Sequence, residues 1–367
     1  MPSPKVIISG GGTGGHIFPA IAIANAIKKR HPNTEVLFVG AKGRMEMEQV
    51  PKAGYRIEGL WISGIQRNLS FKNLLFPIKV ISSLWKAYSI LKKFKPNVVV
   101  GTGGYASGPM LKIASMNGIP TVVQEQNSYA GITNKLLGKT VDKVCVAYED
   151  MERFFPAEKV VLTGNPVRKE VVTIEGKREK AFEFFGLDPS IKTVLVVGGS
   201  LGAKAVNDSL IPHIPEFDEN QIQLIWQTGK VSFQEVAEAV SHSHSKGIKV
   251  HQFIAQMDLA YAAADLVVSR AGAIAVSEIC LTGKACVLVP LPTAAEDHQT
   301  KNAIALAQHD AAIIVRNSDA PHMLFQKLLD LIHNEEELSK LQNNIRPLGM
   351  ENSDDKIADV VIKLMDI

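Results

Sequence analysis

The sequence predicts an α/β protein with two units of parallel sheet covered by helices, and three observations carry this prediction. Apolar runs of strand length alternate with helical patterns, as in KVIISG, a helix from about Pro19 to Lys29, and then EVLFVG. The same rhythm restarts at TVLVVGGSLGA, residues 193–203. The length of 367 residues is sufficient for about two domains.

The remaining strands are expected in chain order from their apolar runs. In the first unit these are NVVVGTGG, TVVQEQ and KVVLTG, and in the second they are QLIWQTG, KVHQFI, DLVVSRAG and ACVLVPLP. The turn-forming GNPVR segment after KVVLTG, followed by a charged helical stretch at 175–185, predicts a boundary between domains 1–164 and 165–349. A last helix, about 353–365, follows a Pro-Gly turn, and its pattern alone does not say which domain it packs on.

The composition excludes several classes of protein. With 46% hydrophobic and 21% charged residues, the chain is neither disordered nor collagen-like. Cys145, Cys280 and Cys286 are too scattered for a disulfide framework or a metal knuckle, which predicts buried thiols in a reducing cytoplasm. No secretory signal and no membrane span are expected, because the N-terminus lacks a long apolar region and no run of about 18 apolar residues occurs.

The net charge of +3 conceals an asymmetry. Residues 1–165 hold 21 Lys and Arg against 10 Asp and Glu, or +11, whereas residues 166–367 hold 19 against 27, or −8. The N-terminal half is therefore expected to face an anionic partner.

Three glycine-rich turns follow strands, at 10–16, 101–109 and 198–203. A glycine turn that leads into a helix offers backbone N–H groups and a helix N-terminus to an anion, so the three together predict sites for phosphorylated ligands at the carboxyl ends of the strands. The alternative is that these glycines only permit tight turns.

The first turn satisfies G-x-G-x-x-G, but a dinucleotide site also needs an acidic residue after the second strand, where this chain has Lys42. The chain has no P-loop motif and no Asp-x-Asp motif. No metal and no cofactor are therefore predicted, and the charge of a diphosphate would be met by N–H groups and Arg168.

Several side chains at helix starts are candidates for chemistry. His16 ends the first glycine turn, where a neutral imidazole can accept a proton, although a surface or capping histidine is the plain alternative. Glu278, about two turns into a helix after SRAG, is suited to a ribose diol. His298, Gln299 and Asn302 cluster at another helix start, where they could contact sugar hydroxyls or cap the helix.

A basic and apolar stretch occupies residues 61–95. No acidic residue lies between Glu58 and Glu125, and lysines are interleaved there with Trp61, Trp85 and many aliphatic residues. This pattern predicts peripheral contact with an anionic membrane. A core helix with a solvated basic face is the alternative, and the chain has no recognised nucleic-acid module.

Taken together, GGTGGHIFPA, GGYASGP, QEQNSYAGITNK, GNPVR, GGSLGA, SRAGAIAVSE and the run 299–303 resemble the MurG family of glycosyltransferases. These motifs stand in the family's order from residue 11 to residue 303. The resemblance implies a GT-B fold, two Rossmann-like domains facing a cleft, with the last helix (about 350–367) returning to the first domain. It also implies inverting transfer of N-acetylglucosamine from UDP-N-acetylglucosamine to the 4-hydroxyl of the muramoyl sugar of lipid I, giving lipid II and UDP in peptidoglycan synthesis.

The resemblance also implies roles for individual residues. His16 is the candidate base, Asn127 would face the sugar, Arg168 and Ser200 would address the diphosphate, and the backbone of Ile254 would meet uracil. The remaining positions match the donor-contacting loop (Thr13, Gly14, Gly15), the nucleotide-binding turn with its ribose carboxylate (Ala273, Ile274, Ala275, Val276, Ser277, Glu278) and a sugar-reading glutamine (Gln299). Ala275, Leu201 and His298 depart from the family's pattern, and Ala275 removes one hydroxyl that would bond the diphosphate.

Two other classes of function stay open on the residues alone. One is a different UDP-sugar enzyme of the same fold, such as a 2-epimerase or a glycolipid synthase, and the other is a membrane-bound module that binds the nucleotide without catalysis. On the preferred interpretation the partners are lipid I in the inner leaflet and proteins of cell-wall synthesis. The location is then the cytoplasmic face of the bacterial membrane.

Overall fold

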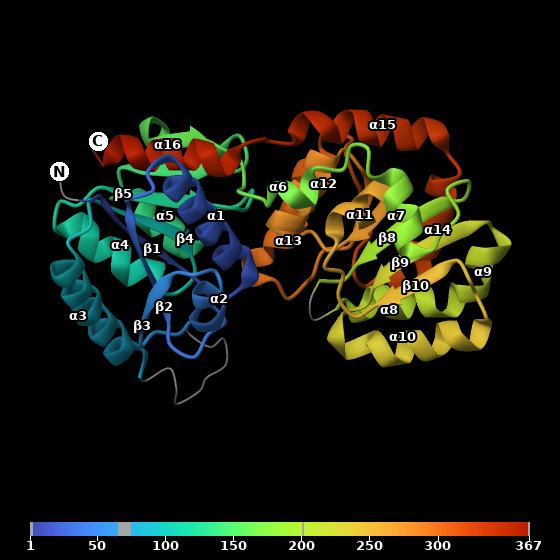
Figure 1. Cartoon of the computed structure of the whole chain (residues 1–367), viewed down its shortest axis with the longest axis horizontal. Coiled ribbons are helices and arrows are strands. Elements are labelled where there is room, and N and C mark those ends of the chain that lie inside the picture. Colours follow the sequence, from blue (N-terminus) through green and yellow to red (C-terminus); the bar gives the residue numbers. More distant parts are fainter. Residues whose placement is uncertain (1–2, 65–74, 200–201, 366–367) are drawn as a thin grey trace. The chain divides into compact units, whose positions relative to one another are not determined.

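A computed structural model describes residues 3–64, 75–199 and 202–365. The chain forms two compact units, of which unit 1 is Met1–Val167 with Asn352–Ile367 and unit 2 is Arg168–Glu351. The first division falls three residues after the predicted end of domain 1 at residue 164. Both units are Rossmann-like layers of helix, parallel sheet and helix, as the sequence predicts (Figure 1).

Unit 1 is built on a seven-stranded parallel sheet in the order β3-β2-β1-β4-β5-β6-β7. Its strands are β1 Lys5–Gly10, β2 Glu35–Ala41, β3 Arg56–Leu60, β4 Val98–Gly103, β5 Thr121–Glu125, β6 Lys143–Val146 and β7 Val160–Leu162. Its helices are α1 Gly14–Arg30, α2 Glu46–Lys52, α3 Phe76–Phe94, α4 Ser107–Met116, α5 Ile132–Gly138 and α16 Ser353–Leu364, with short 3-10 turns at Met151–Arg153 and Ala157–Lys159.

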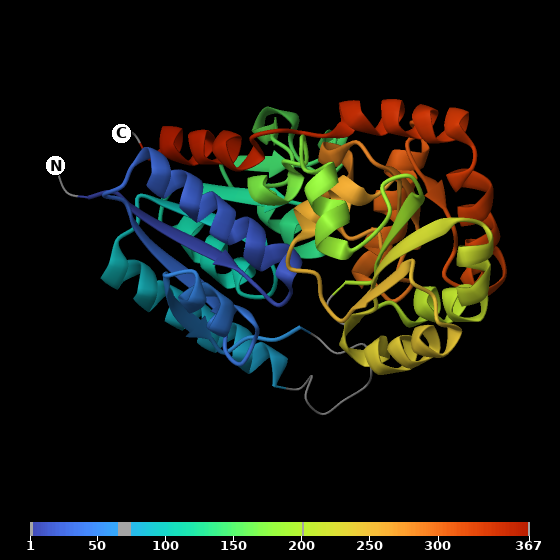
Figure 2. The same cartoon turned by 45° about the vertical axis from the view of Figure 1, so that its right-hand side comes forward.

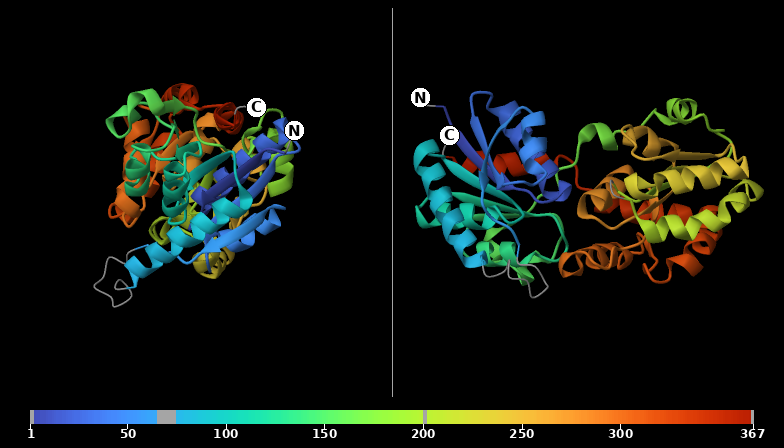
Figure 3. Two further views of the ribbon diagram at one scale, coloured as in Figure 1. Left: turned by 90° about the vertical axis from the view of Figure 1, so that its left-hand side faces the viewer. Right: turned by 90° about the horizontal axis from the view of Figure 1, so that it is seen from below.

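Helices cover both faces of this sheet because successive strand residues point to opposite sides. Val6 and Ile8 of β1 pack in one cluster with α1, α2 and α16, whereas Ile7 packs in a second cluster with α3, α4 and α5. Figures 2 and 3 show the helical layers on the two sides. The strands therefore read as continuous apolar runs, which is why their pattern is visible in the sequence.

The last helix belongs to unit 1, and Figure 1 shows α16, in red, alongside α1. Ile357, Ala358 and Val361 of α16 are fully buried in the α1 cluster. At the rim, Arg30 at the end of α1 pairs with Asp355 at 3.2 Å and with Asp359 at 3.4 Å. Because residues 352–367 add four acidic and two basic residues to the first unit, unit 1 carries +9 and unit 2 carries −6.

Unit 2 repeats the plan with a six-stranded parallel sheet in the order β10-β9-β8-β11-β12-β13. Its strands are β8 Lys192–Val197, β9 Ile222–Gln227, β10 Ile248–His251, β11 Leu266–Ser269, β12 Ala285–Leu288 and β13 Ile313–Ile314. Its helices are α6 Lys169–Val172, α7 Arg178–Phe185, α8 Lys204–Leu210, α9 Ile214–Glu219, α10 Gly229–Ser243, α11 Met257–Ala263, α12 Ala273–Thr282, α13 His298–Ala307, α14 Ala320–Ile332 and α15 Glu335–Ile345. Short 3-10 turns lie at Ile211–His213, Ala295–Asp297 and Arg346–Leu348.

The core of unit 2 again has two faces. Val194 and Val196 of β8 are fully buried in a cluster with α8, α9, α10, α14 and α15. Leu195, between them, is fully buried on the opposite face, which carries α11. Among the described helices of the chain, none is both long and apolar enough to cross a membrane.

Candidate functional site

Many of the predicted site residues follow the strands at which each sheet reverses its strand order. In unit 1 the reversal lies between β1 and β4, and in unit 2 it lies between β8 and β11. In an open parallel sheet, ligands bind outside the carboxyl ends of the strands at such a switch point. The glycine turns at 10–16 and 101–109 flank the switch point of unit 1, and the segments that directly follow β8 and β11 flank that of unit 2.

The first glycine turn runs into α1, which begins at Gly14 with Thr13 as its N-cap residue. The first turn of α1 has no acidic residue, and the N–H groups of Gly14 and Gly15 precede the first intrahelical bonds of the helix. Thr13 and Gly15 are exposed. This helix start can therefore receive an anion.

The two glycine turns of unit 1 approach each other too closely for side chains. At Gly104, where φ is +84°, an added Cβ would lie 2.2 Å from the Gly11 carbonyl oxygen. At Gly103, where φ is +102°, an added Cβ would lie 2.7 Å from the His16 ring. These glycines therefore do more than turn the chain, because they let the second loop pack directly on the first and on the His16 side chain.

Glu46, the first residue of α2, supports the first loop from behind. Its carboxylate is fully buried and accepts hydrogen bonds from the Gly12 N–H at 2.8 Å and the Ala41 N–H at 2.9 Å. Sequence reasoning missed this residue, because nothing near Glu46 indicates that α2 folds back to the end of β1.

His16 is the third residue of α1 and is half-buried beside the loop. Its Nδ1 lies 3.1 Å from Oε1 of Gln126, and its backbone carbonyl accepts a hydrogen bond of 2.9 Å from Thr102 Oγ1. Ring and backbone are therefore held by segments that follow β5 and end β4.

Glu125 shapes the loop that follows β5. This buried carboxylate accepts hydrogen bonds from the Asn127 N–H at 3.0 Å, the Gly131 N–H at 3.1 Å and Asn134 Nδ2 at 2.8 Å. The Asn127 side chain also donates to Glu125, at 3.1 Å, through Nδ2. Glu125 thus helps to orient the Asn127 side chain.

In unit 2, Glu278 lies on α12 with two partners that approach it from other elements. The Tyr261 hydroxyl donates a hydrogen bond of 3.1 Å to its Oε2. Burial raises the pKa of Glu278, whereas Tyr261 and the charge of Arg168 oppose that rise. Burial also raises the pKa of Tyr261 well above its usual value, so that the phenol stays protonated as a donor. Sequence reasoning missed Tyr261.

The start of α12 is a second helix N-terminus open to an anion. Gly272 is its N-cap residue, Ala273–Ala275 are half-exposed, and no acidic residue lies in the first turn. Ser277 directs its hydroxyl to the Ala273 carbonyl at 3.0 Å, and Val276 is buried. Arg168, the exposed N-cap residue of α6, is the cation of this region that acts on Glu278.

The remaining predicted positions of unit 2 have defined partners. The buried Ile254 donates its N–H to Gln227 Oε1 at 2.9 Å. Gln299, the second residue of α13, accepts a hydrogen bond of 2.9 Å from the Leu291 N–H, so its amide NH2 remains to donate. Ser200 and Leu201 lie outside the described residues.

Arg270 and Asn302 fix the turn before α12. Arg270 donates to the Val289 carbonyl at 2.9 Å and to Asn317 Oδ1 at 2.8 Å, and burial lowers its pKa. Asn302, fully buried on α13, donates to the Ala271 carbonyl at 3.2 Å. Both residues therefore hold the turn that leads into α12, and Arg270 was not singled out from the sequence.

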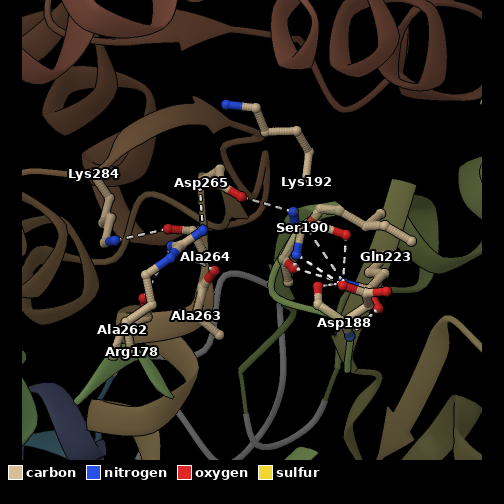
Figure 4. A network of polar contacts seen from close by, with 12 residues as sticks. Arg178, Asp188, Ser190, Lys192, Gln223, Ala262, Ala263, Ala264, Asp265 and Lys284 are labelled. Carbon is tan, nitrogen blue, oxygen red and sulfur yellow. Dashed lines mark hydrogen bonds and ion pairs between the residues drawn. The ribbon is translucent and has the colours of Figure 1, made fainter. Parts of the chain in front are cut away.

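A further polar network lies at the opposite, amino-terminal edge of the unit 2 sheet (Figure 4). Arg178 pairs with Asp265 at 3.0 Å, and Asp265 in turn accepts a hydrogen bond of 2.8 Å from the N–H of Thr193 in β8. Lys284 donates to the Ala264 carbonyl at 2.7 Å, and burial lowers its pKa to about 8. Because it lies away from the carboxyl ends of the strands, this network is structural.

The three cysteines are buried as predicted, and burial raises the pKa of Cys145 and of Cys280 to about 12. Among the described residues, no group of three His, Cys, Asp or Glu side chains could hold a metal ion.

Comparisons with known proteins agree with this arrangement. Residues 6–146 match the glycosyltransferase family 28 N-terminal domain, and residues 193–359 match its C-terminal domain. A UDP-N-acetylglucosamine–N-acetylmuramyl-(pentapeptide) pyrophosphoryl-undecaprenol N-acetylglucosamine transferase from Cytophaga hutchinsonii is 52% identical over 100% of this chain and 99% of its own length. One of the same description from Parabacteroides distasonis is 51% identical over 100% of both chains.

Among solved structures, Acinetobacter baumannii MurG is similar, with a TM-score of 0.80, 31% identity and coverage of 98% of this chain and 99% of its own. The match spans both units, and it agrees with the GT-B fold that the sequence predicts. The chain therefore belongs to glycosyltransferase family 28 and, within it, to the N-acetylglucosamine transferases of peptidoglycan synthesis.

Proposed function

We propose that the chain transfers N-acetylglucosamine from UDP-N-acetylglucosamine to the 4-hydroxyl of the N-acetylmuramoyl sugar of lipid I, forming lipid II and UDP with inversion at the transferred carbon. The observation that carries the proposal is identity of about half over the full length with enzymes described as this transferase. The two helix starts at the switch points supply the anion sites that two diphosphate substrates require.

The chemical step is a single displacement with His16 as the base. The acceptor oxygen attacks the anomeric carbon while its proton passes to the His16 ring, and the bond to UDP breaks with the electron pair leaving on the diphosphate. The position of His16 in the first turn of α1 supports this role, because the imidazole stands beside the anion-receiving N–H groups of the same turn. The protonated ring then releases its proton to solvent.

Charge that gathers on the leaving diphosphate is met by preorganised donors. The N–H groups at the start of α12 and the exposed Arg168 are the groups proposed to do this, with no metal ion required. Glu278, oriented by Tyr261, would accept two hydrogen bonds from the ribose diol, and the Ile254 carbonyl and the Gln299 amide would contact the base and the sugar.

Peripheral membrane contact is the second part of the proposal, and α3 supports it. One stripe of this helix, Ser83, Ala87, Ile90 and Leu91, is buried in the core of unit 1. A second stripe is apolar and yet exposed, with Ile78 54%, Ile81 57% and Trp85 73% accessible. A core helix with a solvated polar face would not show the second stripe, whereas a helix lying in a membrane interface would.

Lysines surround this stripe. Lys79 lies 5.8 Å from the ring centre of Trp61 and Lys92 lies 5.3 Å from that of Tyr88, while Lys86 pairs with Glu58 at 2.7 Å. Residues 65–74 of the predicted stretch lie outside the described residues. From the exposed apolar stripe and the lysines around it, we propose that the protein lies at the cytoplasmic face of the bacterial membrane, where lipid I and proteins of cell-wall synthesis would meet it.

One assay tests the transfer. Radiolabelled UDP-N-acetylglucosamine is incubated with a lipid I analogue and the products are scored for a labelled disaccharide lipid and UDP, with and without EDTA. The proposal expects the disaccharide in both conditions. Conversion of the labelled donor to a second UDP-sugar would indicate an epimerase, and donor binding without any product would indicate a non-catalytic module. Loss of transfer in EDTA with recovery in Mg²⁺ would overturn metal independence.

A further inference from the structure

The His16 ring is held by a chain of side-chain amides that the proposed function leaves without a role. Gln124, Gln126 and Asn165 are all buried, with accessible fractions of 0%, 2% and 2%, and they connect His16 with the end of β5 and with the GNPVR segment. A buried side-chain amide places its NH2 group against acceptors and its oxygen against donors. The orientation of the amide therefore shows which neighbouring atoms carry hydrogen.

The orientation of each amide can be followed from a backbone group that admits only one partner. The backbone carbonyl of Gln126 can only accept a hydrogen bond, and Asn165 Nδ2 donates one to it at 2.9 Å. Asn165 therefore presents Oδ1 to Gln124, whose Nε2 donates to it at 3.0 Å. Gln124 consequently presents its own Oε1 to the Gln126 Nε2 group.

The last amide in the chain is fixed independently from a second direction. Gln126 Nε2 also donates to the Thr102 carbonyl at 2.6 Å and faces the Gln124 carbonyl at 3.3 Å. Turning the amide over would place its oxygen against these carbonyls, which repel it. Gln126 Oε1 therefore faces His16 Nδ1, at 3.1 Å.

An amide oxygen is an acceptor only, so the ring nitrogen opposite it must carry hydrogen. We infer that Gln126 is a positioning residue that holds neutral His16 as the Nδ1–H tautomer, so that Nε2 carries the lone pair that receives the acceptor proton. This inference rests on the proposed role of His16 as base. When Nε2 takes the proton, the Nδ1–H bond to Gln126 persists and the imidazolium keeps the orientation of the neutral ring.

The choice of an amide instead of a carboxylate at this position has an electrostatic consequence. A carboxylate would also orient the ring, but it would put a full negative charge next to a helix start proposed to receive anions. A neutral oxygen sets the tautomer without adding a second negative charge to the one that Glu46 already brings to the Gly12 N–H.

The tautomer is measured directly in the unmodified full-length chain. The protein is labelled with ¹⁵N-histidine, His16→Asn identifies the His16 signals by their loss, and long-range ¹H–¹⁵N correlations are recorded above the pH at which the ring is protonated. The expected spectrum shows Nδ1 as the protonated nitrogen and Nε2 as the unprotonated one. The reverse pattern would overturn the inference without reference to turnover.

Gln126→Met, which keeps the side-chain length and removes the polar atoms, tests the consequence for catalysis. We expect the His16 signals to shift toward Nε2–H and kcat to fall by about 10- to 100-fold, within the range of a misplaced general base, with KM for UDP-N-acetylglucosamine changed less than about twofold. An unchanged kcat would overturn the positioning role.

Gln223→Met is the matched control. Gln223 is also a buried glutamine that accepts from one backbone N–H, of Asp188 at 2.7 Å, and donates to the Asp188 carbonyl at 2.7 Å, but it lies at the amino-terminal edge of unit 2 (Figure 4). Both variants should lose thermal stability, and only Gln126→Met should change the tautomer and kcat. If His16→Ala retained wild-type turnover, the proposed base would be wrong, whereas loss in His16→Ala with no loss in Gln126→Met would reject the positioning role alone.

Discussion

Glu46 Oε2 accepts a hydrogen bond of 2.8 Å from the N–H of Gly12, which joins the start of α2 to the glycine turn that carries His16. The other carboxylate oxygen accepts from the Ala41 N–H at 2.9 Å. Both carboxylate oxygens are thus used, and the fully buried Glu46 fixes the path of the loop at Gly12.

Glu46→Gln should therefore loosen the first glycine turn. An amide has only one oxygen, so one of the two N–H groups would face an NH2 group, and an unsatisfied buried donor costs about 1–3 kcal/mol. We expect the free energy of unfolding to fall by about that amount and turnover to decrease. Glu48→Gln is the matched control, since Glu48 is exposed on the same helix. Equal denaturation midpoints for the two variants would contradict this role.

Tyr261→Phe should weaken donor binding through Glu278. The phenol donates to Glu278 Oε2 at 3.1 Å, and a hydrogen bond to a charged group contributes about 1.5–3 kcal/mol. Because Glu278 is the residue proposed to hold the ribose, we expect KM for UDP-N-acetylglucosamine to rise by about tenfold with a smaller change in kcat. Tyr55→Phe, which removes the hydroxyl that contacts Asn25 in unit 1, should leave KM unchanged. A wild-type KM in Tyr261→Phe would contradict the proposal that Glu278, oriented by Tyr261, binds the ribose.

The exposed stripe of α3 predicts binding to anionic vesicles. Ile81→Ser with Trp85→Ser should reduce sedimentation with vesicles that contain anionic lipid, and high salt should reduce it further by screening the lysines, each of which contributes about 1 kcal/mol near the surface. Val231→Ser removes a residue of α10 that is 76% exposed and should have no effect. Equal sedimentation of the double variant and the wild-type protein would contradict a role of this stripe in membrane binding.

Lys284 predicts a pH dependence of stability. Burial lowers its pKa to about 8 in the folded chain, whereas an unfolded lysine titrates near about 10.4. Between these values the unfolded state binds more protons, so this residue makes the free energy of unfolding rise with pH. Below the folded pKa of about 8, Lys284 is charged in both states, and its burial lowers the free energy of unfolding by the largest amount.

Lys284→Met should remove that component. Relative to wild type, the variant should therefore lose its advantage as the pH rises from about 8 to about 10.4, as measured by denaturant unfolding at each pH. Lys192→Met is the control, because Lys192 starts β8 at the same edge and pairs with Glu335 at 2.5 Å on the surface. Parallel stability curves for Lys284→Met and wild type would contradict the assignment.

The fold was predictable because both sheets are parallel and covered on both faces. Buried parallel strands are continuous apolar runs, and the runs from KVIISG to ACVLVPLP all became strands. The strands that the pattern missed have weaker signals. Edge strand β3 has only Leu60 buried, β6 has four residues, and β13 has two. The path of α16 was not predictable from periodicity, because its apolar stripe fits any helix-covered sheet.

The site was predictable only where a motif is local. Glycines before a helix start are visible in the sequence, and so is His16 directly after them. Gln126 lies 110 residues from His16, and Glu46 lies 34 residues from Gly12, so each contact depends on how strands are ordered in the sheet. Tyr261 reaches Glu278 from another helix for the same reason. The net charges of the two parts also differ from the values counted by sequence halves, because residues 352–367 return to unit 1. The halves carry +11 and −8, whereas the structural units carry +9 and −6.

The most direct test of the proposed mechanism is the turnover of His16→Ala with UDP-N-acetylglucosamine and a lipid I analogue, measured beside the affinity of the variant for UDP. With His16 as the base, kcat should fall by at least about 10²-fold while UDP affinity stays near that of wild type, because UDP is assigned to unit 2. Wild-type turnover in His16→Ala would contradict the mechanism.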